Sequence, residues 1–187
     1  MNELDEIFKT TEDHMQKAVD ATRNEFASIR TGRASPGLLD RLMVEAYGAH
    51  VPLKQVATVS TPDARTLQIA AFDRNTVGAI RKAIETSDLG LNPNIDGSTL
   101  RLQIPPLTEE RRKDLVKVVK KKAEDGKIAV RNIRHKSVDH IKALLKDHAI
   151  TEDENKRATE RIQKATDKYI KDVDVLVAGK EKEIMEV

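Results

Sequence analysis

The stretch that decides the fold is Leu107–Asp147, which reads LTEERRKDLVKVVKKKAEDGKIAVRNIRHKSVDHIKALLKD. It contains no proline, and Gly126 is its only glycine. Apolar and small residues recur every three or four positions, as in a helix that buries one long face. They are Leu115, Val118, Val119, Lys122 (through its stem), Gly126, Ala129, Ile133, Ser137, Ile141 and Leu144. The pattern predicts one uninterrupted helix of about forty residues, roughly 60 Å long.

Basic residues form a second row along the same helix, which we call the basic ridge. At about 100° per residue they fall in one sector, which we place opposite the buried face. The ridge consists of Lys113, Lys117, Lys120, Lys127, Arg131, Arg134 and Lys142. The whole chain carries a net charge of only +2, yet residues 106–147 hold 13 basic and 7 acidic side chains. This concentration of charge indicates an anionic partner for the helix.

The remaining composition narrows the class of protein. Charged residues make up 34% of the chain and aromatic residues 3%, which suits long exposed helices. The chain has no cysteine, so disulfides, thiolate metal sites and thiol nucleophiles are excluded. No apolar run approaches the roughly eighteen residues of a membrane span. The acidic start, MNELDE, is unlike a secretory signal, so we expect a cytoplasmic protein.

Two further long helices are predicted to pack on the first. Residues 2–30 place Leu4, Phe8, Thr11, Met15, Ala18, Thr22, Phe26 and Ile29 on one side in alternating steps of three and four. A third helix begins after a capping box, with Thr151 as its N-cap and Glu154 reaching back, and runs to about Glu186. Its buried face comprises Ala158, Ile162, Ala165, Tyr169, Val173, Leu176, Lys180 (stem) and Ile184.

The middle of the chain follows a different period. Alternating or short apolar runs predict strands at residues 42–47, 51–53, 56–59, 66–72 and 99–104, with a turn at 48–50. A helix is predicted from Asn75 or Thr76 to about Ser87, followed by a loop over residues 88–97. We therefore predict an elongated α+β protein, in which residues 1–30 and 106–187 form a three-helix bundle and residues 31–105 form an inserted α+β domain.

The two ends of the inserted domain carry backbone-breaking residues. Thr31 and Gly32 end the first helix, and Pro105-Pro106 precede the second. Because both ends must leave the bundle at the same place, we predict that these four residues form a hinge, about which the inserted domain moves.

No catalytic constellation is visible. Gly126-Lys127 and Gly179-Lys180 do not form a phosphate-binding loop, because both lie inside predicted helices. His135 and His140 are five residues apart, which is a poor spacing for two ligands of one metal. We expect neither an enzyme, nor a cofactor, nor a metal site.

The basic ridge is open to two interpretations. It can be an ordinary solvated helix face, or it can bind a polyanion. Arg131 and Arg134 lie one turn apart, and their forked guanidinium groups suit phosphate. The five aromatic residues are assigned mostly to cores, which leaves no stacking platform for single strands. Structured RNA, read through its shape and phosphates, is the favoured ligand.

Four longer strings resemble the bacterial ribosome recycling factor family. They are IRTGRASP (29–36), SDLGLNPN (87–94), IPPLTEERR (104–112) and AVRNIR (129–134). The resemblance covers essentially the whole chain. One departure is His135, where a third basic residue is expected in some relatives.

The resemblance implies a fold, a function and a set of contacts. The fold is a three-helix bundle and a small β/α/β domain set in an L, a shape likened to transfer RNA. The function is to split the post-termination 70S ribosome into subunits together with elongation factor G, which hydrolyses the GTP. The bundle is expected on 23S ribosomal RNA of the 50S subunit, and the inserted domain is expected to face elongation factor G. Arg131 and Arg134 correspond to family RNA contacts, and Arg30, Arg33 and Arg112 are further candidates, with Lys113, Lys117, Lys120 and Lys127 of the ridge.

One rival interpretation comes from another functional class. A helical bundle can also be an adaptor that assembles with proteins, in which case the ridge is merely solvated. We expect the chain to be a monomer that binds no membrane.

Overall fold

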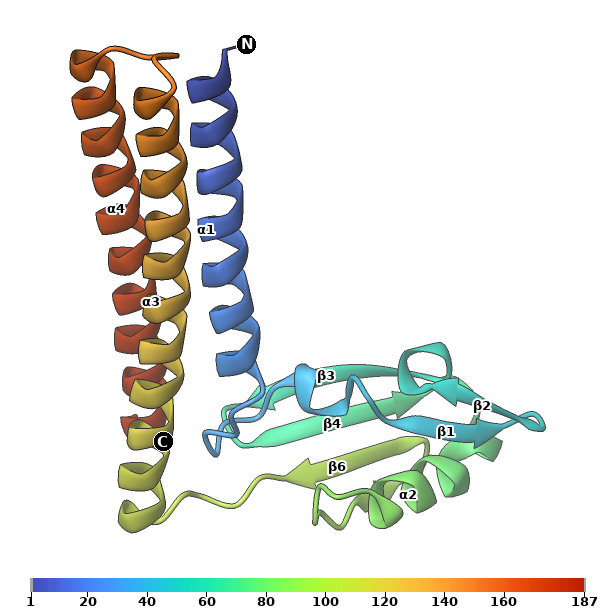
Figure 1. Cartoon of the computed structure of the whole chain (residues 1–187). Coiled ribbons are helices and arrows are strands. Elements are labelled where there is room, and N and C mark those ends of the chain that lie inside the picture. Colours follow the sequence, from blue (N-terminus) through green and yellow to red (C-terminus); the bar gives the residue numbers. More distant parts are fainter. Residues whose placement is uncertain (1, 187) are drawn as a thin grey trace. The chain divides into compact units, whose positions relative to one another are not determined.

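The computed structural model describes residues 2–186, which divide into two compact units. One unit comprises Met1–Ile29 with Lys113–Lys182, and the other comprises Arg30–Arg112 with Glu183–Val187. The first unit is helical and the second is built on β-sheets, so the α+β class is confirmed. Figure 1 shows the elements of both units.

Three long helices form the first unit. They are α1 (Glu3–Ala27), α3 (Glu109–Lys146) and α4 (Glu152–Met185), and they run side by side in Figure 1. The predicted capping box at the start of α4 is present: the Glu154 N–H donates to Thr151 Oγ1 (3.1 Å), and the Thr151 N–H donates to Glu154 Oε1 (3.3 Å). Since such a box satisfies amide groups left unpaired at a helix start, it fixes where α4 begins.

The buried faces follow the predicted period, with some positions out of phase by one residue. On α3 the buried residues are Leu115, Val119, Ala123, Gly126, Val130, Ser137, Ile141 and Leu144. Val118 is 40% exposed, so its assignment to the buried face was wrong. Val130 is buried where Ala129 was predicted, and on α1 Val19 is buried where Ala18 was predicted. In each pair the bulkier residue is buried, because it removes more apolar area from water.

Gly126 has a packing reason to lack a side chain. A Cβ at this position would overlap the hydroxyl of Thr22 on α1 and lie 3.4 Å from the Thr22 Cβ and Cγ2. The Thr22 hydroxyl donates to the carbonyl of Ala18 (3.0 Å), which fixes its position. Gly126 therefore allows a close approach of α3 to α1 at Thr22.

Replacing Gly126 with alanine is expected to destabilise the bundle. Overpacking a tight contact costs about 1–3 kcal/mol, which outweighs the roughly 1 kcal/mol that alanine adds to helix propensity. Gly179→Ala on α4 is the matched control, because no atom lies within 4 Å of its added Cβ, and it should raise the melting temperature by about 2–4 °C. Thermal unfolding of both variants checks this. Equal increases in melting temperature would contradict the close contact, whereas Thr22→Ala should rescue Gly126→Ala.

The second unit contains two antiparallel sheets and a helix. Strands β1 (Met43–Ala46) and β2 (Ala49–Pro52) form a hairpin, while β3 (Ala57–Asp63), β4 (Thr66–Ala71), β5 (Asn94–Asp96) and β6 (Thr99–Gln103) form a sheet in the order β3-β4-β6-β5. Helix α2 (Val77–Thr86) buries Ile80 and Ile84 in one core with Leu67 and Leu102 of the larger sheet. The structure corrects two predictions, because Ala49 and His50 belong to β2 and not to the turn, and because the predicted loop over residues 88–97 includes β5.

Candidate nucleic-acid interface

The two arginines singled out in the sequence lie on the surface of α3. Arg131 is 43% exposed in its side chain and donates from Nη1 to Glu124 Oε1, two turns earlier (3.2 Å). Arg134 is half-buried, and its Nη1 donates to Gln163 Oε1 on α4 (3.5 Å). Neither guanidinium group is enclosed by carboxylates, so both keep N–H donors that could meet phosphate oxygens.

The basic ridge borders α4 and does not lie opposite the buried face. Lys127 pairs with Asp174 of α4, and Lys120 Nζ lies 4.0 Å from Glu181 Oε1. At 100° per residue, the centres of the ridge and of the buried face are roughly 110° apart. The predicted position was therefore wrong, because the helical period of α3 alone does not tell where α4 packs against it.

Acidic residues on α4 follow the same edge at seven-residue spacing. They are Glu160, Asp167, Asp174 and Glu181. This is the arrangement by which flanking charges pair across two adjacent helices. Part of the ridge charge is thus neutralised within the bundle.

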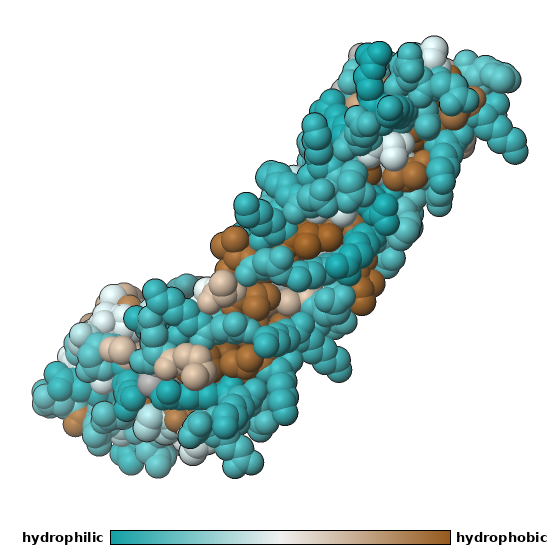
Figure 2. All heavy atoms as spheres, turned by 90° about the vertical axis from the view of Figure 1, so that its left-hand side faces the viewer, coloured by the Kyte–Doolittle hydropathy of each residue, from teal (hydrophilic) through white to brown (hydrophobic). Residues whose placement is uncertain are grey.

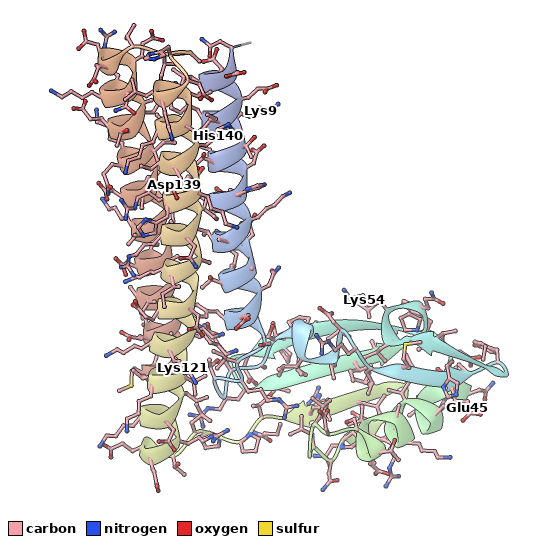
Figure 3. All side chains as sticks on the ribbon, viewed as in Figure 1. Lys9, Glu45, Lys54, Lys121, Asp139 and His140 are labelled. Carbon is pink, nitrogen blue, oxygen red and sulfur yellow. The ribbon has the colours of Figure 1, made fainter. Side chains whose placement is uncertain are left out.

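The other ridge lysines differ in their surroundings. Lys113, Lys117 and Lys142 are exposed, and among residues 2–186 Lys117 and Lys142 form no ion pair. The side of α3 that points directly away from the bundle carries both signs of charge, as Lys121 and Asp139 in Figure 3 illustrate. Lys117 and Lys142 are therefore ridge residues that are both exposed and outside any ion pair within the described residues.

Arg112 and Arg30 make contacts inside the second unit. Arg112 Nη1 donates to the carbonyl of Met185 (3.3 Å), where a cation stabilises the C-terminal end of α4. Arg30 Nη1 donates to the Leu89 carbonyl (3.4 Å), and its Nη2 lies 4.0 Å from Asp88 Oδ1. Arg33 is exposed. Of these three candidates, Arg30 and Arg33 are exposed and Arg112 is half-buried.

The four predicted hinge residues lie close together within the second unit. Thr31 is buried, and its hydroxyl donates to Glu183 Oε1 (3.0 Å). Gly32 has a φ of +75°, and a Cβ there would lie 3.0 Å from Leu107 Cγ and 3.6 Å from the Pro105 carbonyl. The two segments also line a common cavity of about 260 Å³, to which Pro106 and the loop at residues 89–91 contribute. Glycine is required at position 32 both by the positive φ and by this contact.

Two aromatic residues are more exposed than the sequence suggested. Tyr47 is 78% exposed and Phe72 is 66% exposed, so their assignment to a core was wrong. The Tyr47 hydroxyl donates to Asp73 Oδ2 (2.8 Å). The backbone N–H of Asn75 and this hydroxyl lower the pKa of the Asp73 carboxyl, and the same hydrogen bond raises the pKa of Tyr47. The aromatic residues of the bundle are buried, whereas Tyr47 and Phe72, which follow β1 and β4, are accessible for base stacking.

One basic surface was missed in the sequence. Exposed basic residues recur along α4 in steps of four and three, and they are Arg157, Arg161, Lys164, Lys168 and Lys171. Figure 2 shows the side of the molecule on the left of Figure 1, where hydrophilic side chains cover most of the surface around scattered apolar patches. The 4-3-4-3 spacing of these residues is readable from the sequence.

Other kinds of site find little support. Across residues 2–186 there is no group of three or more His, Cys, Asp or Glu side chains that could hold a metal ion. Within the same residues, every helix is too short or too polar to cross a membrane. A groove between α1 and α3 is lined by Glu6, Thr11, His14, Ser137 and His140, and it includes the Thr11–Ser137 hydroxyl pair (2.6 Å).

Comparisons with known proteins agree over nearly the whole chain. A family model described as "Ribosome recycling factor" matches residues 22–185. The ribosome-recycling factor of Symbiobacterium thermophilum is 57% identical over 182 residues (97% of this chain and 98% of the other). That of Thermosynechococcus vestitus is 58% identical over 176 residues (94% and 97%).

Solved structures give the same result. A solution structure of a ribosome recycling factor superimposes with a TM-score of 0.79 at 46% identity and full coverage of both chains. A second match has a TM-score of 0.66 at 52% identity and covers 97% of this chain and 98% of the other. It belongs to models of the T. thermophilus ribosome recycling factor and the E. coli elongation factor G bound to the E. coli post-termination complex.

Proposed function

The chain belongs to the ribosome recycling factor family, and from this membership we propose that it releases ribosomes from messenger RNA after termination. It splits the post-termination 70S complex into subunits together with elongation factor G, which supplies the GTP hydrolysis. The observation that carries the proposal is the 52% identical relative, which belongs to models of a ribosome recycling factor and elongation factor G bound to a post-termination complex. Ribosome recycling factors are translation factors and not enzymes, in agreement with the sequence prediction. The proposed location is the cytoplasm.

The proposed binding partner of the bundle is 23S ribosomal RNA in the 50S subunit. Arg131 and Arg134 form the centre of this contact, since their guanidinium groups remain accessible on α3. Lys113 and Lys117 extend it along the helix. Arg30, Arg33 and Arg112, which belong to the second unit, are further proposed RNA contacts. Lys120 and Lys127 contribute less, because their charges are paired with Glu181 and Asp174.

The proposed mechanical role rests on stiffness and a hinge. A helix such as α3, with 38 residues held by backbone hydrogen bonds, can transmit force along its length. Thr31, Gly32, Pro105 and Pro106 form the hinge, and the inserted domain (31–105) moves about it against the bundle (1–30 and 106–187) when elongation factor G pushes on it. The protein thus acts as a wedge between the subunits.

Co-sedimentation with 50S subunits at increasing salt tests the RNA contact. Because each phosphate contact releases counterions, we expect the logarithm of the binding constant to fall with the logarithm of the salt concentration, with a slope of about −0.7 to −0.9 per contact. Four to six contacts give a slope of about −3 to −5. The rival adaptor function, which the pairing of ridge lysines with α4 would suit, predicts no retention on 50S subunits at any salt concentration.

A further inference from the structure

We propose that the row of basic residues along α4, which we call the α4 stripe, binds the phosphate backbone of a second RNA segment, distinct from the one that α3 contacts. This inference rests on the proposed function, because it takes ribosomal RNA as the partner. It concerns residues on a different helix face from those proposed above. The stripe consists of Arg157, Arg161, Lys164, Lys168 and Lys171.

The geometry of the stripe favours a linear anionic ligand. Successive members are four, three, four and three positions apart, so they form one continuous row from Arg157 to Lys171, or about 21 Å of helix. All five side chains are exposed. The next position of the spacing, four residues after Lys171, is the apolar Val175, which is 63% exposed. Consecutive charges are about 5 Å apart along the axis, so they can follow successive phosphate groups of one strand.

The charges of the stripe are unpaired, unlike those of the basic ridge. Within residues 2–186, none of the five residues forms an ion pair with a carboxylate. By contrast, Lys120, Lys127 and Arg131 on α3 each have a carboxylate partner within 4.0 Å. An unpaired cation can bind phosphate without first breaking an ion pair. The stripe therefore offers more uncompensated positive charge than the ridge that the sequence pointed to.

Two members of the stripe are held in place by aromatic rings. The Arg161 guanidinium carbon lies 4.1 Å from the centre of the Phe8 ring on α1, and Lys168 Nζ lies 4.6 Å from the centre of the Tyr169 ring. A guanidinium group stacked on a ring keeps its edge N–H donors available for phosphate. Less side-chain freedom is then lost on binding, which strengthens the contact.

An acidic row separates the stripe from the arginines of α3. Arg134 rests on Gln163, which is adjacent to Lys164, so the two basic surfaces lie at the same level of the bundle. Between them run Glu160, Asp167 and Asp174 on the side of α4 that faces α3. One phosphate backbone cannot follow both surfaces without crossing these carboxylates. The geometry therefore points to two separate RNA segments, one on each side of the acidic row.

Binding measurements with a matched pair of variants test the stripe. Lys164→Gln/Lys171→Gln removes two unpaired charges and keeps the helix-forming stems. The control Lys9→Gln/Lys17→Gln removes the same net charge from two exposed lysines of α1 (Lys9 is labelled in Figure 3). We expect the α4 variant to bind 50S subunits roughly 10- to 50-fold more weakly at about 0.1 M salt, with a salt slope shallower by about 1.5–2 units, while the control changes little. Equal effects of the two variants would overturn the proposal.

A mapping experiment separates this inference from the proposed function. Because the chain has no cysteine, single-cysteine variants can carry a tethered iron chelate that cleaves nearby RNA. We expect His135→Cys, next to Arg134, and Lys164→Cys to cleave 23S RNA at two different places, and Lys17→Cys on α1 to cleave neither. Cleavage from position 135 alone refutes the α4 contact and leaves the proposed function standing. If no position cleaves and the unmodified chain shows no salt-dependent binding, both proposals fall.

Discussion

Arg131→Ala/Arg134→Ala is expected to bind 50S subunits about 100-fold more weakly than the unmodified chain. Hydrogen bonds to charged groups contribute about 1.5–3 kcal/mol each, and 1.4 kcal/mol corresponds to a factor of ten in affinity. Stability should hardly change, because the Arg131–Glu124 pair is exposed and such pairs contribute at most about 1 kcal/mol. We therefore expect the melting temperature to fall by less than about 4 °C.

Two further variants test this result: one should leave 50S binding unchanged, and the other should strengthen it. Arg81→Ala on α2 removes one charge and a comparable exposed helix ion pair with Glu85, and it should leave 50S binding nearly unchanged. Glu124→Gln should tighten binding, because it frees Arg131 and removes a carboxylate from the path of the phosphate. A large loss of stability in the double arginine variant would instead assign these residues to the packing of α3 against α4.

Gly32→Val is expected to slow subunit splitting more than it weakens binding. A branched residue at φ +75° costs about 1–2 kcal/mol, and its Cβ would press against Leu107 at the predicted hinge. Gly97→Val is the matched control, because Gly97 also has a positive φ (+63°) but no atom lies within 4 Å of its added Cβ. Light scattering of 70S ribosomes with elongation factor G and GTP measures the splitting rate. If both valine variants split ribosomes equally fast, the contact between Gly32 and Leu107 has no part in the movement.

The long helices were predictable because their signals are local. A buried face repeats every three or four residues over helices of 25, 38 and 34 residues, and the Thr151–Glu154 box marks the start of α4 within one turn. Single positions were less certain, since neighbouring apolar residues such as Val118 and Val119 fit the period almost equally well. Which of the two is buried depends on where α1 and α4 pack, and that information lies outside α3.

The candidate interface was predictable in composition but not in placement. The sequence identifies Arg131 and Arg134 as basic residues one turn apart, but it does not show that Gln163 and Asp174 of α4 border the same edge. In the sequence Arg112 is one more basic residue, whereas the structure shows that it donates to the Met185 carbonyl. Partners that are more than twenty residues away in the chain decide which charges remain available for a ligand.

The Thr11–Ser137 hydroxyl pair joins two residues that are 126 positions apart in the chain. Helix α1 leaves the translating ribosome first, yet the helices that cover it are made last. At about 5–20 residues per second, its apolar face waits roughly ten to thirty seconds for α4 to be completed. The threonines on that face make the nascent segment less prone to aggregate during this interval, at the expense of some apolar area in the finished bundle. Thr11 and Thr22 thus reduce the apolar area that α1 exposes before the bundle closes.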